Sequence, residues 1–285
     1  MARTIHKTAV VASGAELGED VHVGPYSVIG PHVRVGDGTH IGAQVVIDGV
    51  TTIGKENRIV GQASIGGRPQ DLSYEDEPTC LEIGDHNTVR EFVTINRGTV
   101  KGGALTRIGS HCLFMACSHV AHDCEIADGV MLANNALLAG HVYVGTGAII
   151  NGAAAAHQFV SVGQHAYVGG MTRVIQDVPP FMILEGHPAR VRKVNVIGLE
   201  RSGFDREEIR ELRDVFRLIY RSGQPRHRIV GQLEEQGVGG LVAMLLEELK
   251  RTELGSKGRF RETLREDFLA AGQRRMEGVA AGGAH

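Results

Sequence analysis

Three short histidine motifs contain the residues best suited to chemistry. They read His-Val-Ala-His-Asp at residues 119–123, Leu-Ala-Gly-His at 138–141 and Ala-His-Gln-Phe at 156–159. An imidazole whose pKa lies near neutrality can remove a proton from a hydroxyl nucleophile. His122 is the best candidate for such a general base, and Asp123 is directly adjacent to it in the sequence.

A six-residue repeat sets the elements that must position these histidines. Counted in sixes from Ile5 to Ile65, each position is a bulky aliphatic residue, often followed by glycine. The repeat resumes at Ile83 and again at Ile108, from where it continues to Val174. A helix would repeat every three to four residues and a plain strand every two. A short strand followed by a tight corner fits a period of six, so we predict a parallel β-helix with a continuous aliphatic core.

Interruptions and composition divide the chain further. Polar or glycine-rich breaks predict loops that leave the repeat. Pro179 and Pro180 end it, because proline cannot donate to a strand ladder. From Leu199 the apolar residues follow a helical period. The predicted parts are a β-helix over 1–180 with loops at about 66–82 and 97–107, a connector over 181–198, a helical C-terminal domain over 199–277 and a disordered tail over 278–285.

Beyond the hexads, several segments resemble the UDP-N-acetylglucosamine acyltransferase family, which makes the first committed intermediate of lipid A. The resemblance extends from the N-terminus to about Ser222 and is most specific at residues 119–124, 132–135, 138–142 and 176–180. It implies a left-handed parallel β-helix, although connections between parallel strands are normally right-handed. It also implies a homotrimer with active sites between subunits.

The family's reaction would transfer a 3-hydroxyacyl group from acyl carrier protein to the 3-hydroxyl of UDP-N-acetylglucosamine. In that family three hexads form one coil, which would stack His122 under Gly140 and Gly140 under Gln158. His122 and Asp123 would then be catalytic, and the backbone N–H of Gly140 would stabilise the oxyanion. No metal or cofactor is implied beyond the phosphopantetheine on the carrier.

The resemblance also implies further substrate contacts. Gln70 and Asp71 match glucosamine contacts, and Asn195 and Arg201 match positions near the uridine and phosphates. Positions that hold the sugar nucleotide or the acyl chain are matched by His119, His141, His157 and Gln158. Gly170 matches the position that measures acyl length, and Met171 next to it could shorten the pocket. Ser73 and Ser202 depart from the family, where a lysine and a second arginine are found.

Several alternatives stay open at this point. The acceptor could be a 3-amino sugar nucleotide. The chain could also be the related UDP-glucosamine N-acyltransferase, but that family has an extra N-terminal domain, whereas the hexads begin here at Ile5. Imidazoles can also cap corners in a non-catalytic scaffold, or hold zinc as in β-helix carbonic anhydrases. Arginines along one helical face over 206–221 could be simply solvated or could receive an acidic carrier protein.

Bulk properties exclude other classes. A net charge of -3 and a pI near 6.5 do not predict a nucleic-acid partner. Four cysteines without a C-x-x-C pair do not predict a disulfide scaffold or a zinc knuckle. The chain has no apolar run long enough for a membrane span, and its N-terminus lacks a signal-peptide pattern. We therefore expect a cytoplasmic protein.

Overall fold

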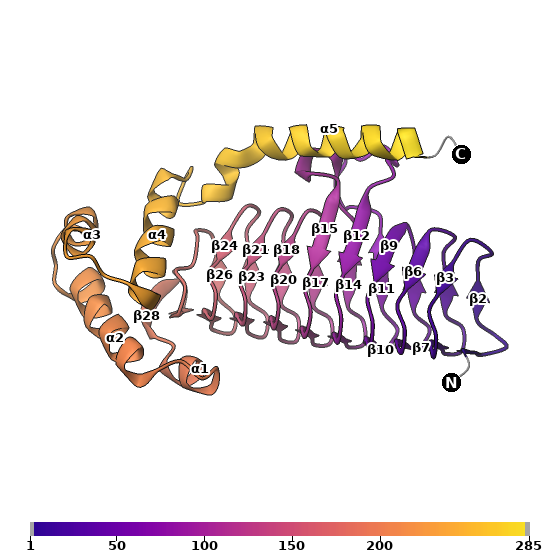
Figure 1. Ribbon diagram of the computed structural model, residues 1–285, viewed down its shortest axis with the longest axis horizontal. Coiled ribbons are helices and arrows are strands. Elements are labelled where there is room, and N and C mark those ends of the chain that lie inside the picture. The colour runs from indigo at the N-terminus through magenta and orange to yellow at the C-terminus, as the bar shows by residue number, and fades with distance from the viewer. Residues whose placement is uncertain (1–2, 283–285) are drawn as a thin grey trace.

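Short parallel strands separated by tight corners form a long prism in the computed structural model, which describes residues 3–282 (Figure 1). The first face consists of β1 (Thr4–Ile5), β4 (His22–Val23), β7 (His40–Ala43), β10 (Arg58–Gly61), β13 (Thr88–Val89), β16 (Leu113–Phe114), β19 (Met131–Leu132), β22 (Ile149–Ile150) and β25 (Tyr167–Val168). The second face consists of β2 (Val10–Val11), β5 (Val28–Ile29), β8 (Val46–Ile47), β11 (Ser64–Gly67), β14 (Thr94–Asn96), β17 (His119–Val120), β20 (Leu137–Leu138), β23 (Ala155–Ala156) and β26 (Arg173–Val174). The third consists of β3 (Glu16–Leu17), β6 (Val33–Val35), β9 (Val50–Ile53), β12 (Cys80–Ile83), β15 (Leu105–Ile108), β18 (Glu125–Ile126), β21 (Tyr143–Val144) and β24 (Ser161–Val162).

The strand register confirms that three hexads make one coil. Val120 pairs with Leu138, Leu138 with Ala156, and Ala156 with Val174, each one coil further along the chain. The two loops leave this ladder without changing its register, since Ile53 pairs with Ile83 and Ile83 with Ile108. The hexad aliphatics point inward and form one continuous buried core.

Corner residues give the prism its sharp edges. Asp123, His141 and Phe159 occupy equivalent places on three successive coils, with φ of 61, 64 and 64°. This left-handed backbone conformation is uncommon for residues other than glycine and here turns the chain from the second face to the third. We call residues 122–123, 140–141 and 158–159 the histidine corner.

The expected connector over 181–198 is wrong, because the chain continues as strands there. β27 (Met182–Glu185) pairs in parallel with β25, and β28 (Arg190–Val194) pairs antiparallel with β27. Pro179 and Pro180 therefore end the second and third faces but not the first. Phe181 and Met182 are fully buried just after the prolines, which explains why this segment stays on the prism.

A helical bundle closes this end of the prism. It contains α1 (Val196–Arg201), α2 (Arg206–Arg221), α3 (Arg226–Glu235) and α4 (Gly240–Leu254). Asp205 caps α2 by accepting a hydrogen bond from the N–H of Glu207. Apolar side chains of all four helices form a second core with Phe181 and Met182. No helix among the described residues is long and apolar enough to cross a membrane.

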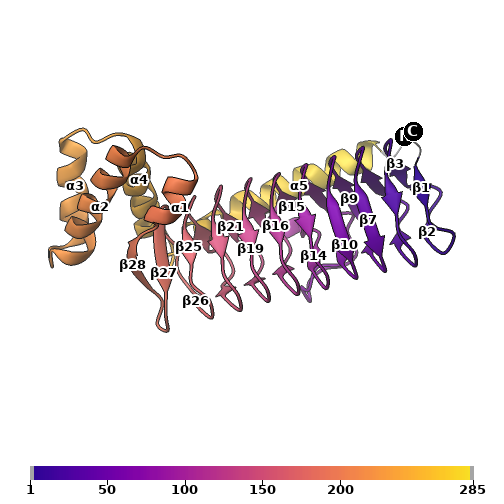
Figure 2. The same cartoon turned by 90° about the horizontal axis from the view of Figure 1, so that it is seen from below.

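The C-terminal segment differs most from expectation. After the short 3₁₀ helix η2 (Phe260–Leu264), α5 (Arg265–Gly282) leaves the bundle and runs back along the prism (Figures 1 and 2). It packs on η1 (Val100–Gly102), a 3₁₀ turn in the second loop. The predicted disorder is wrong for residues 278–282, which continue the helix, and residues 283–285 lie outside the described part.

Candidate active site

A histidine–aspartate pair lies at the histidine corner, between β17 and β18. The Nδ1 atom of His122 lies 2.7 Å from Oδ2 of Asp123. The Asp123 side chain is fully buried, and that of His122 is 13% exposed. If Nδ1–H donates to the carboxylate, Nε2 of the neutral ring is an acceptor. The pair therefore has the arrangement of a general base with an orienting carboxylate.

The second loop supports the buried carboxylate. Asp123 accepts hydrogen bonds from the N–H of Thr99 at 2.7 Å and from its hydroxyl at 2.6 Å. Its own N–H donates to the hydroxyl of Thr106 at 2.8 Å. These bonds satisfy a charge that would otherwise be costly to bury. A Cβ on Gly102 would lie 1.9 Å from Cγ of Asp123, so glycine is required there.

His141 lies beside this pair in a drier environment. Its Nε2 is 3.7 Å from Oδ2 of Asp123, and its ring stacks on Phe159 with a centroid separation of 4.2 Å. Burial lowers the pKa of His141 to about 4. Its buried Nδ1 has no hydrogen-bond partner among residues 3–282. His141 is thus a neutral ring at pH 7, with a polar atom available for a substrate.

Gly140 lies directly over the His122 ring. A Cβ there would be 2.5 Å from Cε1 of His122, so any side chain would displace the imidazole. The carbonyl of Gly140 accepts from the N–H of Phe159, whereas its own N–H has no acceptor within the described residues. That N–H can therefore donate to a developing oxyanion.

His122 and His141 border a cavity of about 610 Å³. Its lining is Gln70, Asp71, Leu72, Lys101, His122, His141, Gln158, Phe159, Arg265 and Leu269. Asp71 accepts hydrogen bonds from the backbone and hydroxyl of Ser73 at 2.8 Å, which lower the pKa of Asp71. Lys101 donates to the same hydroxyl at 2.7 Å, so both loops contribute to the cavity.

Two other predicted histidines are not part of the lining of this cavity. His119 is bonded to the hydroxyl of Thr94 at 2.7 Å, and burial lowers the pKa of His119. His157 borders a separate space of about 290 Å³ with Arg173 and Gln176.

The remaining predicted residues lie elsewhere in the chain. Asn195 caps α1 by accepting from the N–H of Gly198, and it donates to the carbonyl of His165. Arg201 is exposed on α1, and Met171, next to Gly170, is 82% exposed on the opposite edge of the second face. The single chain does not bring these four residues into the catalytic cavity.

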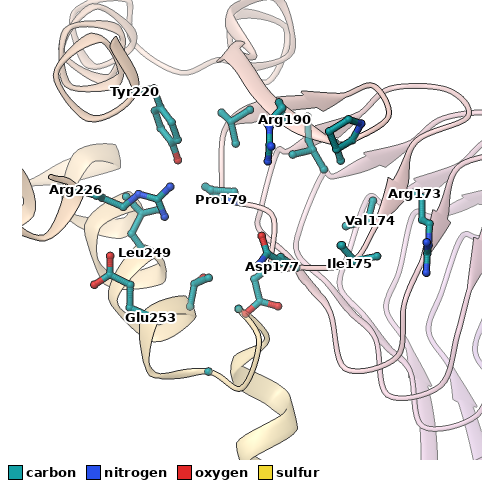
Figure 3. A pocket seen from close by; sticks show the side chains of 18 of the residues that line it. Arg173, Val174, Ile175, Asp177, Pro179, Arg190, Tyr220, Arg226, Leu249 and Glu253 are labelled. Atoms are coloured by element: carbon teal, nitrogen blue, oxygen red, sulfur yellow. The ribbon is translucent and has the colours of Figure 1, made fainter. Parts of the chain in front are cut away.

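A cavity of about 620 Å³ lies at the end of the prism, against the helical bundle (Figure 3). Arg173, Arg190, Arg226, Asp177 and Tyr220 line it. Burial raises the pKa of Asp177 to about 6. This cavity lacks a hydrogen-bonded histidine–carboxylate pair among the described residues, so the smaller space at the histidine corner is the candidate active site.

His122, Asp123 and His141 also place three possible metal-ligand atoms within 4.8 Å of one another. The donor set fits a hydrogen-bonded pair better than a zinc site. The 2.7 Å contact between His122 and Asp123 has hydrogen-bond length, and both carboxylate oxygens already accept from Thr99. The expectation of a metal-free site stays a prediction.

Comparisons with known proteins agree with this geometry. Residues 14–49 and 105–140 match the bacterial transferase hexapeptide family. The fold and the site thus define a hexapeptide-repeat transferase, and residues 177–256 match the second domain of UDP-N-acetylglucosamine O-acyltransferase. The chain is 50% identical over 253 residues to an acyl-[acyl-carrier-protein]–UDP-N-acetylglucosamine O-acyltransferase of Thiobacillus denitrificans, covering 88% of this chain and 98% of the relative. It is 49% identical over 236 residues to the Paraburkholderia phymatum enzyme of the same name, covering 83% and 90%.

Solved structures of the same family are also similar to this chain. UDP-N-acetylglucosamine O-acyltransferase from Moraxella catarrhalis superposes with a TM-score of 0.81 at 38% identity, covering 85% of this chain and 95% of that one. The Francisella novicida acyltransferase gives a TM-score of 0.83 at 33% identity, covering 86% and 90%. This chain belongs to the UDP-N-acetylglucosamine O-acyltransferase family, and its fold is the expected left-handed parallel β-helix with a small helical C-terminus.

Proposed function

We propose that this protein transfers a 3-hydroxyacyl group from acyl carrier protein to the 3-hydroxyl of UDP-N-acetylglucosamine, the first step of lipid A biosynthesis. The names of the relatives support this reaction. The observation that carries the chemistry is the His122–Asp123 pair, with the free N–H of Gly140 above it.

In the proposed mechanism Nε2 of His122 removes the proton of the sugar 3-hydroxyl. The oxygen attacks the thioester carbonyl, and the N–H of Gly140 donates to the resulting oxyanion. The intermediate collapses to the ester and expels the phosphopantetheine thiolate, which takes the proton from the imidazolium. Asp123 keeps the ring oriented and stabilises its charge throughout. No other cofactor takes part.

The cavity lining supports binding of the sugar. Gln70, Asp71, His141 and Gln158 surround the space in front of His122 and are proposed to bind glucosamine and the acyl group. Ser73 stands where the family has a lysine, but Lys101 donates to its hydroxyl and supplies a cation at that place. His119 and His157 would extend the same surface.

We further propose a homotrimer in the cytoplasm. Four aliphatic side chains stand exposed along the second face, which favours burial against another copy: Val10, Val28, Val46 and Leu137. Asn195 and Arg201, which do not line the cavity of their own chain, would bind the nucleotide from a neighbouring subunit. Gly170 and Met171 would likewise limit the acyl chain between subunits.

The deciding experiment measures product mass after incubation with 3-hydroxyacyl carrier proteins and UDP-N-acetylglucosamine. A mono-acylated nucleotide is expected, and the preferred donor reports acyl length. His122→Ala should lower kcat by roughly 10²- to 10⁴-fold, whereas the surface control His111→Ala should retain activity. If only the 3-amino sugar nucleotide is acylated, the acceptor is an amine and not the 3-hydroxyl. Full activity of His122→Ala would refute the proposed base.

A further inference from the structure

The segment after residue 256 lies outside the match to the family's C-terminal domain. The Thiobacillus denitrificans and Moraxella catarrhalis proteins are matched over 98% and 95% of their length, yet they cover 88% and 85% of this chain. Family membership therefore does not explain what this segment does. We call its described part, residues 257–282, the C-terminal strap.

Buried polar contacts fix the start of the strap on the prism. The N–H of Phe260 donates to Oδ2 of Asp177 at 2.8 Å. The guanidinium of Arg259, only 7% exposed as a residue, donates to the carbonyl of Ile175 at 3.0 Å and pairs with Glu262. A buried guanidinium with these partners holds one position.

Backbone packing fixes the middle of the strap at the second loop. A Cβ on Gly272 would lie 1.9 Å from the carbonyl oxygen of Val100, so α5 touches η1 at this glycine. The same loop carries Thr99 and Gly102, which hold Asp123. The position of α5 is therefore tied to the catalytic pair.

The strap also covers the histidine corner directly. Arg261 donates to the carbonyl of His141 at 3.1 Å and pairs with Glu125 at 3.3 Å. Its guanidinium lies 5.0 Å from the ring of Phe268, which in turn is 6.4 Å from the ring of His141. The strap thus contributes to the burial of this histidine.

Arg265 brings a positive charge to the cavity. Its guanidinium lies 4.1 Å from the ring centroid of Phe159, and both side chains line the space in front of His122. Glu262 pairs with both Arg265 and Arg259, so one carboxylate serves two guanidinium groups. Positive charge remains beside the cavity, where Lys101 is a second cation.

We propose that Arg265 is a substrate-binding residue that contacts a phosphate group of a substrate, and that the strap forms one wall of the active site. The planar guanidinium can bind phosphate through two parallel hydrogen bonds, and its stacking on Phe159 limits its freedom before binding. The inference rests on the proposed function, because both proposed substrates carry phosphate: the sugar nucleotide as a diphosphate and the carrier as a phosphodiester.

The first test replaces the charge alone. In Arg265→Gln the dissociation constant for UDP, measured by calorimetry, should rise roughly 10- to 100-fold, as for loss of a charged hydrogen bond. Uridine, which lacks phosphate, should bind both proteins equally. Arg274→Gln, an exposed arginine on the same helix, is the matched control and should bind UDP as the wild type does.

Steady-state kinetics then identify which substrate supplies the phosphate. A higher KM for UDP-N-acetylglucosamine assigns the contact to the nucleotide. An unchanged affinity for UDP with a higher KM for the acyl carrier protein assigns it to the carrier. If Arg265→Gln changes neither constant, the inference is wrong, even when the wild type acylates the nucleotide. Absence of acylation by the wild type would instead refute the proposed function.

The second test displaces the helix in the full-length chain. Gly272→Val should push α5 away from Val100 and weaken phosphate binding as Arg265→Gln does. Gly278→Val places the same residue on α5 at a point with no atom within 4 Å of an added Cβ, and should bind normally. Unchanged or tighter binding by Gly272→Val would show that the strap does not help to bind substrate.

Discussion

The environments of the residues around His122 assign them different roles. Asp123 is buried and accepts three hydrogen bonds, so it can hold the ring of His122 in one orientation. His141, only one coil away, is stacked and desolvated, so it stays neutral. Gly140 contributes no side chain at all, which leaves its N–H open to a reacting oxygen. One corner thereby brings together the proposed base, a neutral polar ring and the proposed oxyanion donor.

Gly140→Ala tests the contact above the base. The added Cβ would lie 2.5 Å from Cε1 of His122, so the ring must move from its position over the cavity. We expect kcat to fall roughly 100-fold or more with an unchanged melting temperature. Gly152→Ala is the matched control, since its Cβ would meet an ordinary contact of 3.4 Å to the carbonyl of Asn134. Equal activity of both variants would contradict the proposed geometry.

His141 should make stability depend on pH. Burial lowers its folded pKa from 6.5 to about 4, so between these values the unfolded chain binds a proton that the native protein does not. Its contribution is constant above pH 6.5, and stability falls as the pH decreases toward 4, by up to roughly 3 kcal/mol. Urea denaturation should measure the free energy of unfolding of the wild type and of His141→Gln across this range. The two free energies should converge at low pH, because only the wild type loses the contribution of His141. Parallel curves would show that His141 is not desolvated.

At the scale of elements, corners and loops position the site while the strands supply regularity. One buried corner carries a hydrogen-bonded ladder, in which Asn57 accepts from the N–H of Asn87 and donates to the carbonyl of Gly84. Asn87 repeats the pattern one coil later with Gly109 and Cys112. Most coils have a small or β-branched residue at this position. Asn57 and Asn87 are accommodated there because their side chains bond backbone N–H and carbonyl groups of the turn.

Asn87→Ala should therefore destabilise the prism without altering catalysis. It would leave the carbonyl of Gly109 and the N–H of Cys112 without a partner, at a cost of about 2–4 kcal/mol in the free energy of unfolding. Urea denaturation measures this loss, and KM should stay unchanged because the ladder is remote from the cavity lining. The exposed Asn134→Ala should change stability by about 0.5 kcal/mol or less. A loss as small in Asn87→Ala would contradict the ladder.

At the scale of the whole molecule, the prism presents faces of different character. The strap lies along the histidine corner, whereas the second face exposes a column of aliphatic side chains. These side chains are exposed to water in a monomer. Burying their apolar area between subunits would contribute about 25 cal/mol per Å² to association. The column is therefore the surface on which the proposed trimer depends.

Val28→Glu should disrupt that assembly. Val28 is 41% exposed on the second face, and a buried, unpaired carboxylate between subunits would oppose association. Light scattering should give three times the 30.6 kDa chain mass for the wild type and a smaller species for the variant. Val60→Glu on the first face, where valine is 38% exposed, should leave the trimer intact. Assembly unaffected by Val28→Glu would place the interface elsewhere.

The sequence alone determined the prism and most of the histidine corner. A period of six predicts stacked short strands, and it located where the hexads begin again, at Ile83 and Ile108. That Ile53, Ile83 and Ile108 pair on one face was decided by the structure, because the loops between them do not keep the period. The same count brought His122, Gly140 and Gln158 together. These are properties of a repeat, in which each coil contacts only its neighbours.

Tertiary structure decided what the repeat does not encode. Thr99 and Gly102 support Asp123 from a loop without a period, and Thr106 does so from β15 directly after that loop. Among these three residues only Gly102 was noted in the sequence, as a glycine of that break. Phe181 and Met182 kept the chain on the first face beyond two prolines, because burial there outweighs the missing ladder bond. Arg265 reaches the cavity from more than 100 residues along the chain. The position of Arg265 depends on where the whole of α5 packs. The local sequence of a helix does not show which distant surface it packs on, because most of its stability comes from tertiary contacts.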